Sequence, residues 1–134
     1  MAKLAAELER QTEAYAKRPK RKFISASTRE YAYAADMRSW VAKIERIGNL
    51  NYPDEARRRQ LHNSLVLTVA VNRDGTVERI DLIQSSGSEV LDQAAMRIVE
   101  LGAPFSPLPA SDEGVDVLHI TRTWQFLDGS VTGK

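Results

Sequence analysis

The alternation of apolar residues over positions 64–72 is the feature that most constrains what this chain can fold into. Every second side chain there is apolar, so one face of a β-strand is apolar. A turn-forming peptide follows at 72–76, where Gly75 accepts a positive φ angle, and residues 77–84 return as a second strand. The sequence therefore predicts a β-hairpin that needs a layer of helices on its apolar face. The residues of that face are Leu65, Leu67, Val69 and Val71.

An amphipathic helix is expected before the hairpin, over residues 28–49. Apolar residues recur there at spacings of three and four, and Ser25, Ser27 and Thr28 are candidate N-caps. We interpret Trp40 and its neighbours as core residues rather than as a cofactor site. The apolar stripe consists of Tyr33, Met37, Trp40, Val41, Ile44 and Ile47.

Two further helices are predicted around the hairpin. Pro53 is suited to the first turn of a short helix, and Ser88 to the N-cap of a longer one over Glu89–Leu101. The apolar stripe of the longer helix includes small residues, which allow a close approach to the sheet. It comprises Leu91, Ala94, Ala95, Ile98 and Leu101.

The last predicted strand covers residues 115–127, after an extended segment at 102–109 whose three prolines exclude regular structure. Arg122 interrupts its apolar row. The expected fold class is α+β in two layers, with helices on one face of a three-stranded antiparallel sheet. The elements follow in the order helix, hairpin, helix and strand, after the amphipathic helix. One strand face carries Leu118, Ile120, Trp124 and Phe126, and the other carries His119, Thr121, Thr123 and Gln125.

Positive charge is concentrated in the hexapeptide 17–22, which holds five of the 19 Lys and Arg residues and no acid. The rest of the chain is mildly acidic, because it contains 18 Asp and Glu residues against the remaining 14 Lys and Arg residues. This distribution argues against a nucleic-acid-binding face within the domain. The hexapeptide itself is interpreted as a solvated linker, with a nucleic-acid or nuclear-targeting signal and an anionic lipid contact as alternatives.

Catalytic and metal chemistry find little support in the composition. The chain has no cysteine and two histidines, His62 and His119, in different predicted elements. The peptide 85–87 lacks the preceding glycine of a nucleophile elbow, and the glycines do not form a phosphate-binding run. We therefore expect neither an enzyme nor a metal or cofactor site. No stretch approaches the roughly 18 apolar residues of a membrane span.

Six motifs in order resemble the C-terminal domain of the TonB energy-transducer family, over roughly residues 50–127. One departure is the segment 61–64, where members often have a glycine before the first strand. The motifs are Tyr52-Pro53-x-x-Ala56-Arg57, the turn at Asp74-Gly75, Ser85-Ser86-Gly87, Leu91-Asp92-x-Ala94-Ala95, Phe105-x-Pro107 and the closing strand.

The resemblance implies a binding function. Similar proteins are anchored in the bacterial inner membrane and reach across the periplasm to the TonB box, a short extended segment of outer-membrane transporters. The inner-membrane partners ExbB and ExbD supply energy from the proton gradient. The anchor and the proline-rich spacer are missing from this sequence, which we expect of an excised domain.

The resemblance also implies that the last strand lies at the sheet edge, where a guest strand can add to the ladder. The expected partner-binding residues are Val117, Leu118, His119, Ile120, Thr121, Arg122, Thr123, Trp124 and Gln125.

Three segments are predicted along the chain: a basic, helix-prone linker over 1–27, the amphipathic helix over 28–49 and the TonB-like domain over 50–134. Two sheet edges make a homodimer an alternative assembly. The alternative functions are a periplasmic adaptor of a surface organelle or secretion system on the same scaffold, and a small enzyme.

Overall fold

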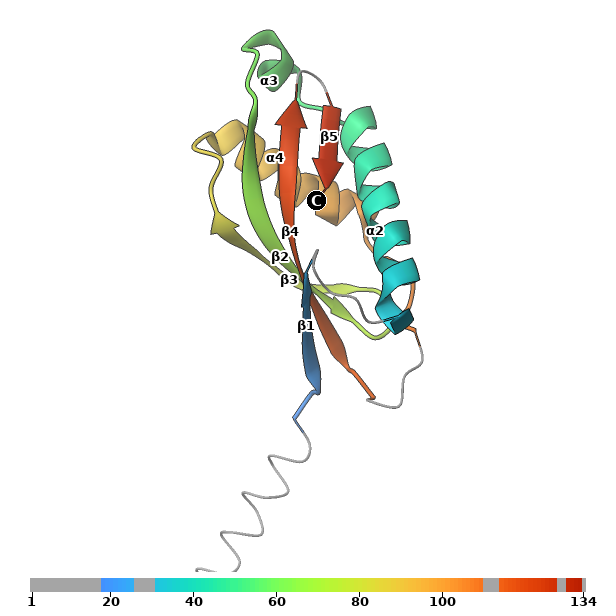
Figure 1. The fold of residues 1–134 in the computed structure, drawn as a ribbon. Helices are drawn as coiled ribbons and strands as arrows, with labels where there is room; N and C mark the ends of the chain where they lie inside the picture. Colours follow the sequence, from blue (N-terminus) through green and yellow to red (C-terminus); the bar gives the residue numbers. More distant parts are fainter. Residues whose placement is uncertain (1–17, 26–30, 110–113, 128–129, 134) are drawn as a thin grey trace, which may run out of the picture.

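The predicted hairpin is present and forms one side of the sheet (Figure 1). A computed structural model describes residues 18–25, 31–109, 114–127 and 130–133. Residues 1–17 of the predicted helix-prone linker lie outside these residues. In chain order the elements are β1 (Arg21–Ser25), α2 (Tyr31–Leu50), α3 (Asp54–Arg58), β2 (Asn63–Asn72), β3 (Val77–Gln84), α4 (Glu89–Gly102), β4 (Val117–Leu127) and β5 (Ser130–Gly133).

The sheet has five strands rather than the three that were expected. Its order is β1-β4-β2-β3, and β5 also pairs with β4. The hairpin, the β2–β4 pair and the β4–β5 pair are antiparallel, whereas β1 runs parallel to β4. The α+β class is confirmed, but the sheet is mixed. The expectation of three strands was wrong because residues 21–25, assigned to a linker, and the C-terminal tail both pair with β4.

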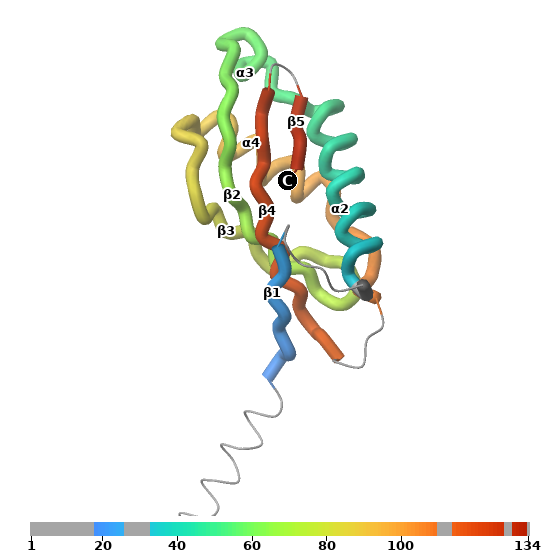
Figure 2. Tube along the Cα trace, in the orientation of Figure 1, coloured from blue at the N-terminus to red at the C-terminus, as the bar shows by residue number. Residues whose placement is uncertain are grey.

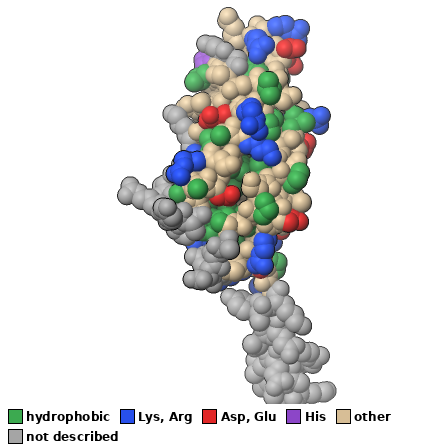
Figure 3. Space-filling model, turned by 90° about the vertical axis from the view of Figure 1, so that its right-hand side faces the viewer, with side chains coloured by type: hydrophobic (Ala, Val, Ile, Leu, Met, Phe, Trp, Pro, Cys, Tyr) green, Lys and Arg blue, Asp and Glu red, His purple; other side chains and the backbone are tan. Residues whose placement is uncertain are grey.

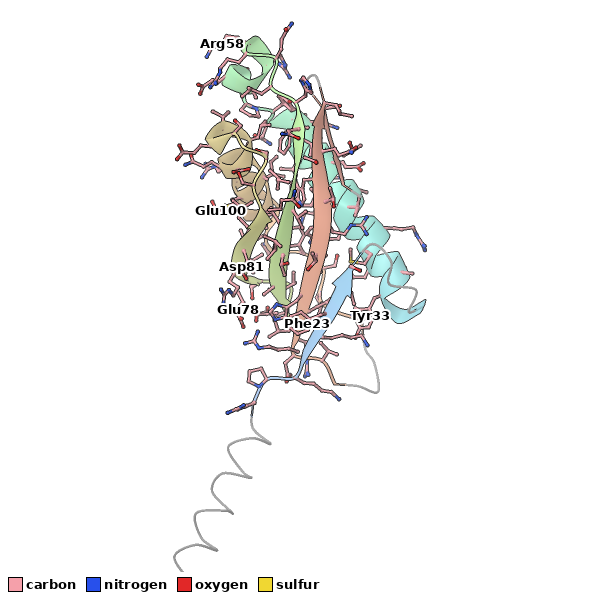
Figure 4. The ribbon with its side chains drawn as sticks, turned by 60° about the vertical axis from the view of Figure 1, so that its left-hand side comes forward. Phe23, Tyr33, Arg58, Glu78, Asp81 and Glu100 are labelled. Carbon is pink, nitrogen blue, oxygen red and sulfur yellow. The ribbon has the colours of Figure 1, made fainter. Side chains whose placement is uncertain are left out.

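Helices α2 and α4 lie on the same side of the sheet, as Figures 1 and 4 show from two directions. The alternating residues of β2 and β4 point into this layer and are buried. The Trp40 side chain of α2 packs edge-on against Trp124 of β4, with ring centroids 6.4 Å apart. The interpretation of Trp40 as a core residue is therefore confirmed. We call the opposite side of the sheet the open face.

The proline-containing segment after α4 is extended, as predicted, and runs against the hairpin turn. Phe105 N–H donates to the Gly75 carbonyl at 2.8 Å, and Leu108 N–H donates to the Arg73 carbonyl at 3.0 Å. Gly75 has a φ of +93°, which side chains disfavour. A Cβ at this position would lie 1.9 Å from the Phe105 carbonyl oxygen, so only glycine fits.

The start of α4 is organised by the predicted cap and by a buried carboxylate. Ser88 is the N-cap and its side chain accepts from Leu91 N–H. Asp92 accepts hydrogen bonds from the Ser85 hydroxyl and from both the backbone N–H and the hydroxyl of Ser86. The predicted Ser88 cap is thus confirmed, and Ser85 and Ser86 join it in a helix-capping loop.

Candidate functional site

The outer edge of β4, the edge that faces away from β2, is where the sequence analysis placed partner binding. β2 pairs with β4 from Asn63 to Asn72 along the inner edge. On the outer edge, β1 pairs with 117–121 and β5 pairs with 124–127. The expectation that β4 is an edge strand was therefore wrong. Figure 2 shows both short strands beside β4.

The predicted binding residues divide between the two faces as the alternation indicated. The helix side carries Leu118, Ile120, Arg122 and Trp124, of which all but Arg122 are buried. The other residues, Val117, His119, Thr121, Thr123 and Gln125, alternate with them. On that second face, Val117 and His119 are buried, and Thr121 forms a hydrogen bond of 2.8 Å with Thr68 of β2.

The parallel pairing of β1 begins at Lys20. Its carbonyl accepts from Asp116 N–H at 2.8 Å and from Val117 N–H at 3.1 Å, and its own N–H donates to Asp116 Oδ2 at 2.8 Å. The ladder then runs from Arg21 opposite Val117 to Ser25 opposite Thr121. β1 is therefore held by main-chain pairing over five residues.

One apolar side chain of β1 enters the core. Ile24 lies opposite Ile120 and is only 3% exposed. Lys22, on the same side of the strand, has its ammonium group 5.5 Å from the ring centroid of Tyr33 on α2. The helix side of β1 thus provides one buried anchor and one cation–π contact.

The open face of β1 carries the aromatic and charged contacts. The Phe23 ring stacks on His119 with centroids 4.4 Å apart, although Phe23 itself remains 71% exposed. Arg21 Nη1 lies 3.1 Å from His119 Nε2 and donates to Glu78 Oε1 at 2.9 Å, while its Nη2 donates to Glu78 Oε2 at 3.3 Å. Figure 4 shows Phe23 on β1, and Glu78 at the far border of the sheet.

His119 is the titratable group at the centre of this cluster. Burial and the positive charge of Arg21 lower its pKa, and the carboxylates of Glu78 and Asp81 oppose this effect. Neutral His119 offers Nε2 as an acceptor to Arg21, whereas an imidazolium would repel it. Arg79, from β3, adds a smaller effect that also favours the neutral form.

β5 is anchored differently from β1, because α2 satisfies its outer N–H groups. Val131 N–H donates to Asn49 Oδ1 at 2.9 Å, and Gly133 N–H donates to Glu45 Oε1 at 3.2 Å. The Val131 side chain is buried against Gly48. Within the described structure both short strands pair with β4 alone, and β5 is held in addition by these hydrogen bonds to side chains of α2.

The β3 strand borders the other side of the sheet, and within the described ranges no strand pairs with its outer edge. Leu82 and Ile83 are exposed there, at 36% and 61%. Charged side chains of the same strand flank them, with Arg79 donating to Asp81 at 2.8 Å. Such charges on an edge strand hinder uncontrolled strand pairing.

Sequence analysis missed four residues that hold β1 in place, which we call the β1 cluster: Arg21, Phe23, Ile24 and Glu78. The basic hexapeptide 17–22 concealed the strand, because its charge suggested a solvated linker. The alternation of Lys22 and Ile24 with Arg21 and Phe23 was the available signal, but five residues are too few to distinguish a strand from a loop.

The described residues contain no group of three or more His, Cys, Asp or Glu side chains that are placed to hold a metal ion. His62 is exposed, and its Nδ1 lies 3.2 Å from the carbonyl oxygen of Gln60. A search of the same part of the chain finds no helix with the length and hydropathy of a membrane span.

Comparison with known proteins identifies relatives of this domain. The family model for the C-terminal region of Gram-negative bacterial TonB proteins matches residues 48–127. Protein TonB of Pasteurella multocida (strain Pm70) is 34% identical over 79 residues, which are 59% of this chain and 29% of that protein. The chain therefore spans less than a third of that relative.

A solved structure supports the fold. The NMR solution structure of the Helicobacter pylori TonB C-terminal domain matches with a TM-score of 0.51 and 21% identity, covering 74% of this chain and 96% of that domain. At this level of identity the likeness concerns the fold alone.

Proposed function

Because this chain belongs to the family of Gram-negative bacterial TonB C-terminal domains, we propose that it is the partner-binding end of a periplasmic energy transducer. Its partner is the TonB box of an outer-membrane transporter. The family is one of non-catalytic energy-transducing proteins, in agreement with a binding role. Anchorage in the inner membrane and coupling to the proton gradient through ExbB and ExbD belong to the proposal on the strength of the family alone.

We place the guest segment on the outer edge of β4, in the position that β1 occupies. The observation that carries this placement is β1 itself: a five-residue strand, which among the described strands pairs only with β4, already uses this edge as a docking site. A guest strand that forms the same ladder can replace it by exchange. The outer edge of β4 is thereby a strand-binding site that β1 already occupies.

The energetics suit an exchange of this kind. Four to six main-chain hydrogen bonds at about 0.5–1.5 kcal/mol each give a few kcal/mol before the cost of association. A micromolar dissociation constant is then expected for a free edge. Competition from the tethered β1 weakens the observed affinity further, because only the fraction of molecules with β1 released is competent.

A pair of disulfide variants tests the placement. Ser25 and Thr121 are opposite residues of β1 and β4, so Ser25→Cys with Thr121→Cys locks β1 onto the edge when oxidised. The native chain has no cysteine to interfere. We expect a labelled TonB-box peptide to bind the reduced variant and to lose binding to the oxidised one.

The matched control locks the other short strand. Gln125 and Thr132 are opposite residues of β4 and β5, so Gln125→Cys with Thr132→Cys crosslinks β5 and leaves β1 untouched. Oxidation of this control is expected to leave peptide binding unchanged. Binding that survives the β1 lock would overturn the proposed position and would point to the outer edge of β1 or of β3.

A further inference from the structure

A short section of the outer edge of β4 is not covered by any described strand. β1 pairs as far as Thr121, and β5 pairs from Trp124 onward. Arg122 and Thr123 lie between them. A guest strand that replaces β1 therefore has room for two more residues before it meets β5.

Arg122 is the charged residue in the helix-facing row of β4, and its side chain lines a hollow of about 370 Å³. The walls come from the end of β1, from β4 and from α2. They comprise Ser25, Ala34, Met37, Arg38, Val41, Ala42, Glu45 and Arg122. Figure 3 looks onto the α2 side of the molecule, where apolar side chains adjoin Lys and Arg.

The guanidinium group of Arg122 lacks an acceptor in the described structure. Its Nε is buried without a hydrogen-bond partner, and no described carboxylate forms an ion pair with it. Glu45 contributes a favourable charge, but its Oε1 accepts from Gly133 N–H. A half-buried guanidinium in this state is a site for an anionic group that can accept two hydrogen bonds.

The register of β1 identifies which residue of a guest would meet Arg122. Lys22 and Ile24 lie opposite Leu118 and Ile120, on the helix side of the sheet. Because side chains alternate along a strand, the next helix-side position lies opposite Arg122.

We propose that Arg122 binds a carboxylate of the guest segment, two residues after the guest residue that replaces Ile24. This inference rests on the proposed function and deepens it, because it specifies the chemistry of the partner. The guest supplies an apolar side chain to the Ile24 position and a carboxylate to the hollow. A doubly charged phosphate fits less well, because Glu45 lines the same hollow.

Three synthetic peptides test the inference against the full chain. Each contains the sequence of residues 20–25. The first continues with Glu and the second with Gln, and both are amidated at the C-terminus. The third continues with alanine and has a free C-terminal carboxylate. It tests whether a chain terminus rather than a side chain supplies the carboxylate that Arg122 binds. The full chain carries Ile24→Ala to weaken its own β1, and its near-ultraviolet circular dichroism is compared with that of the native chain. The native chain itself, titrated at higher peptide concentration, provides the same comparison where the variant is unfolded.

We expect the Glu peptide to bind about tenfold more tightly than the Gln peptide, a difference that corresponds to about 1.4 kcal/mol. Arg122→Gln is expected to abolish this preference. Arg38→Gln, which changes another cation of the same hollow, is expected to preserve it.

The outcomes separate this inference from the proposed function. Equal affinity of all three peptides would overturn the role of Arg122 and leave strand replacement intact. If the peptide with the free C-terminal carboxylate bound more tightly than the Gln peptide, and the Glu peptide did not, Arg122 would bind a chain terminus rather than a side chain. That result would overturn the stated geometry. Failure of every peptide to bind would overturn strand replacement itself.

Discussion

Arg21 on β1 donates to Glu78 on β3 at 2.9 Å, although β4 and β2 lie between these two strands. The two long side chains meet above the open face, where Ala70 of β2 lies opposite both His119 and Arg79. Ala70 leaves space for the bridge because its side chain is small. One ion pair thus links the guest position on β4 to the opposite border of the sheet.

Glu78→Gln is expected to loosen β1 without unfolding the domain. Arg21 then loses its charged acceptor, but the pair is solvent-exposed, so its contribution to stability is small. Amide hydrogen exchange of residues 21–25 should accelerate by up to about fivefold, the small effect expected from the loss of one exposed ion pair. Asp81→Asn, which alters a pair within β3, is the control, and equal acceleration in both variants would contradict the bridge.

Protonation of His119 is expected to destabilise the native state. Its pKa is lowered in the folded protein by burial and by Arg21, so the unfolded chain takes up a proton first as the pH falls. The stability contribution is therefore complete above the unfolded pKa of about 6.5 and is lost as the pH falls from there through the lower folded pKa.

Urea unfolding at several pH values checks this expectation. Between about pH 7 and 5 the free energy of unfolding of the native chain should fall more than that of His119→Gln. The exposed His62 supplies the control, His62→Gln, which should follow the native chain. Parallel curves for the native chain and His119→Gln would refute the assignment.

Asp92→Asn is expected to destabilise the domain by about 1–3 kcal/mol, because it weakens several charge-assisted hydrogen bonds at a buried site. Burial acts to raise the pKa of Asp92, but the hydrogen bonds from Ser85 and Ser86 outweigh it and hold the pKa below its ordinary value. This stabilisation is present above the unfolded pKa and is lost as the pH falls through the folded one. Thermal unfolding measures the change, with the exposed Glu100→Gln on the same helix as a control that should stay within about 0.5 kcal/mol.

Alanine substitutions at two glycines with positive φ distinguish the cost of backbone strain from the cost of a steric clash. Gly87→Ala places a Cβ in open space and should cost about 1–2 kcal/mol, the penalty of the left-handed conformation alone. Gly75→Ala adds a clash with the Phe105 carbonyl and displaces the hydrogen bond that Phe105 N–H donates. We expect the second substitution to cost at least about 2 kcal/mol more in urea unfolding. A similar loss of unfolding free energy in both variants would show that the extended segment moves away from the added Cβ at little cost, and would contradict the predicted clash.

The elements with strong local patterns were predictable from the sequence. The hairpin follows from alternation and a glycine turn, and α4 follows from its apolar stripe and the Ser88 cap. Each pattern depends on residues that are neighbours along the chain, and each is long enough to be distinctive. The same patterns also support the family resemblance, which the family comparison confirms.

The proposed site keeps the strand that was predicted from the sequence, but that strand has other neighbours than expected. β4 was expected to have a free edge, yet β1 and β5 cover most of it. Ser25 was considered as a helix cap, and it instead ends β1. Short strands with mixed polarity carry too little local signal, because their stability comes from the partner strand.

The sequence alone determined the hairpin, the helices that flank it, the long last strand and which of their faces are apolar, because the periodicity of side chains is a local property. The tertiary structure decided the order of the strands, the pairing of residues 21–25 with β4 and the convergence of Arg21, His119 and Glu78. Those relationships join residues far apart along the chain. Main-chain hydrogen bonding is the same for every sequence, so the choice of partner strand is settled only when the whole core packs.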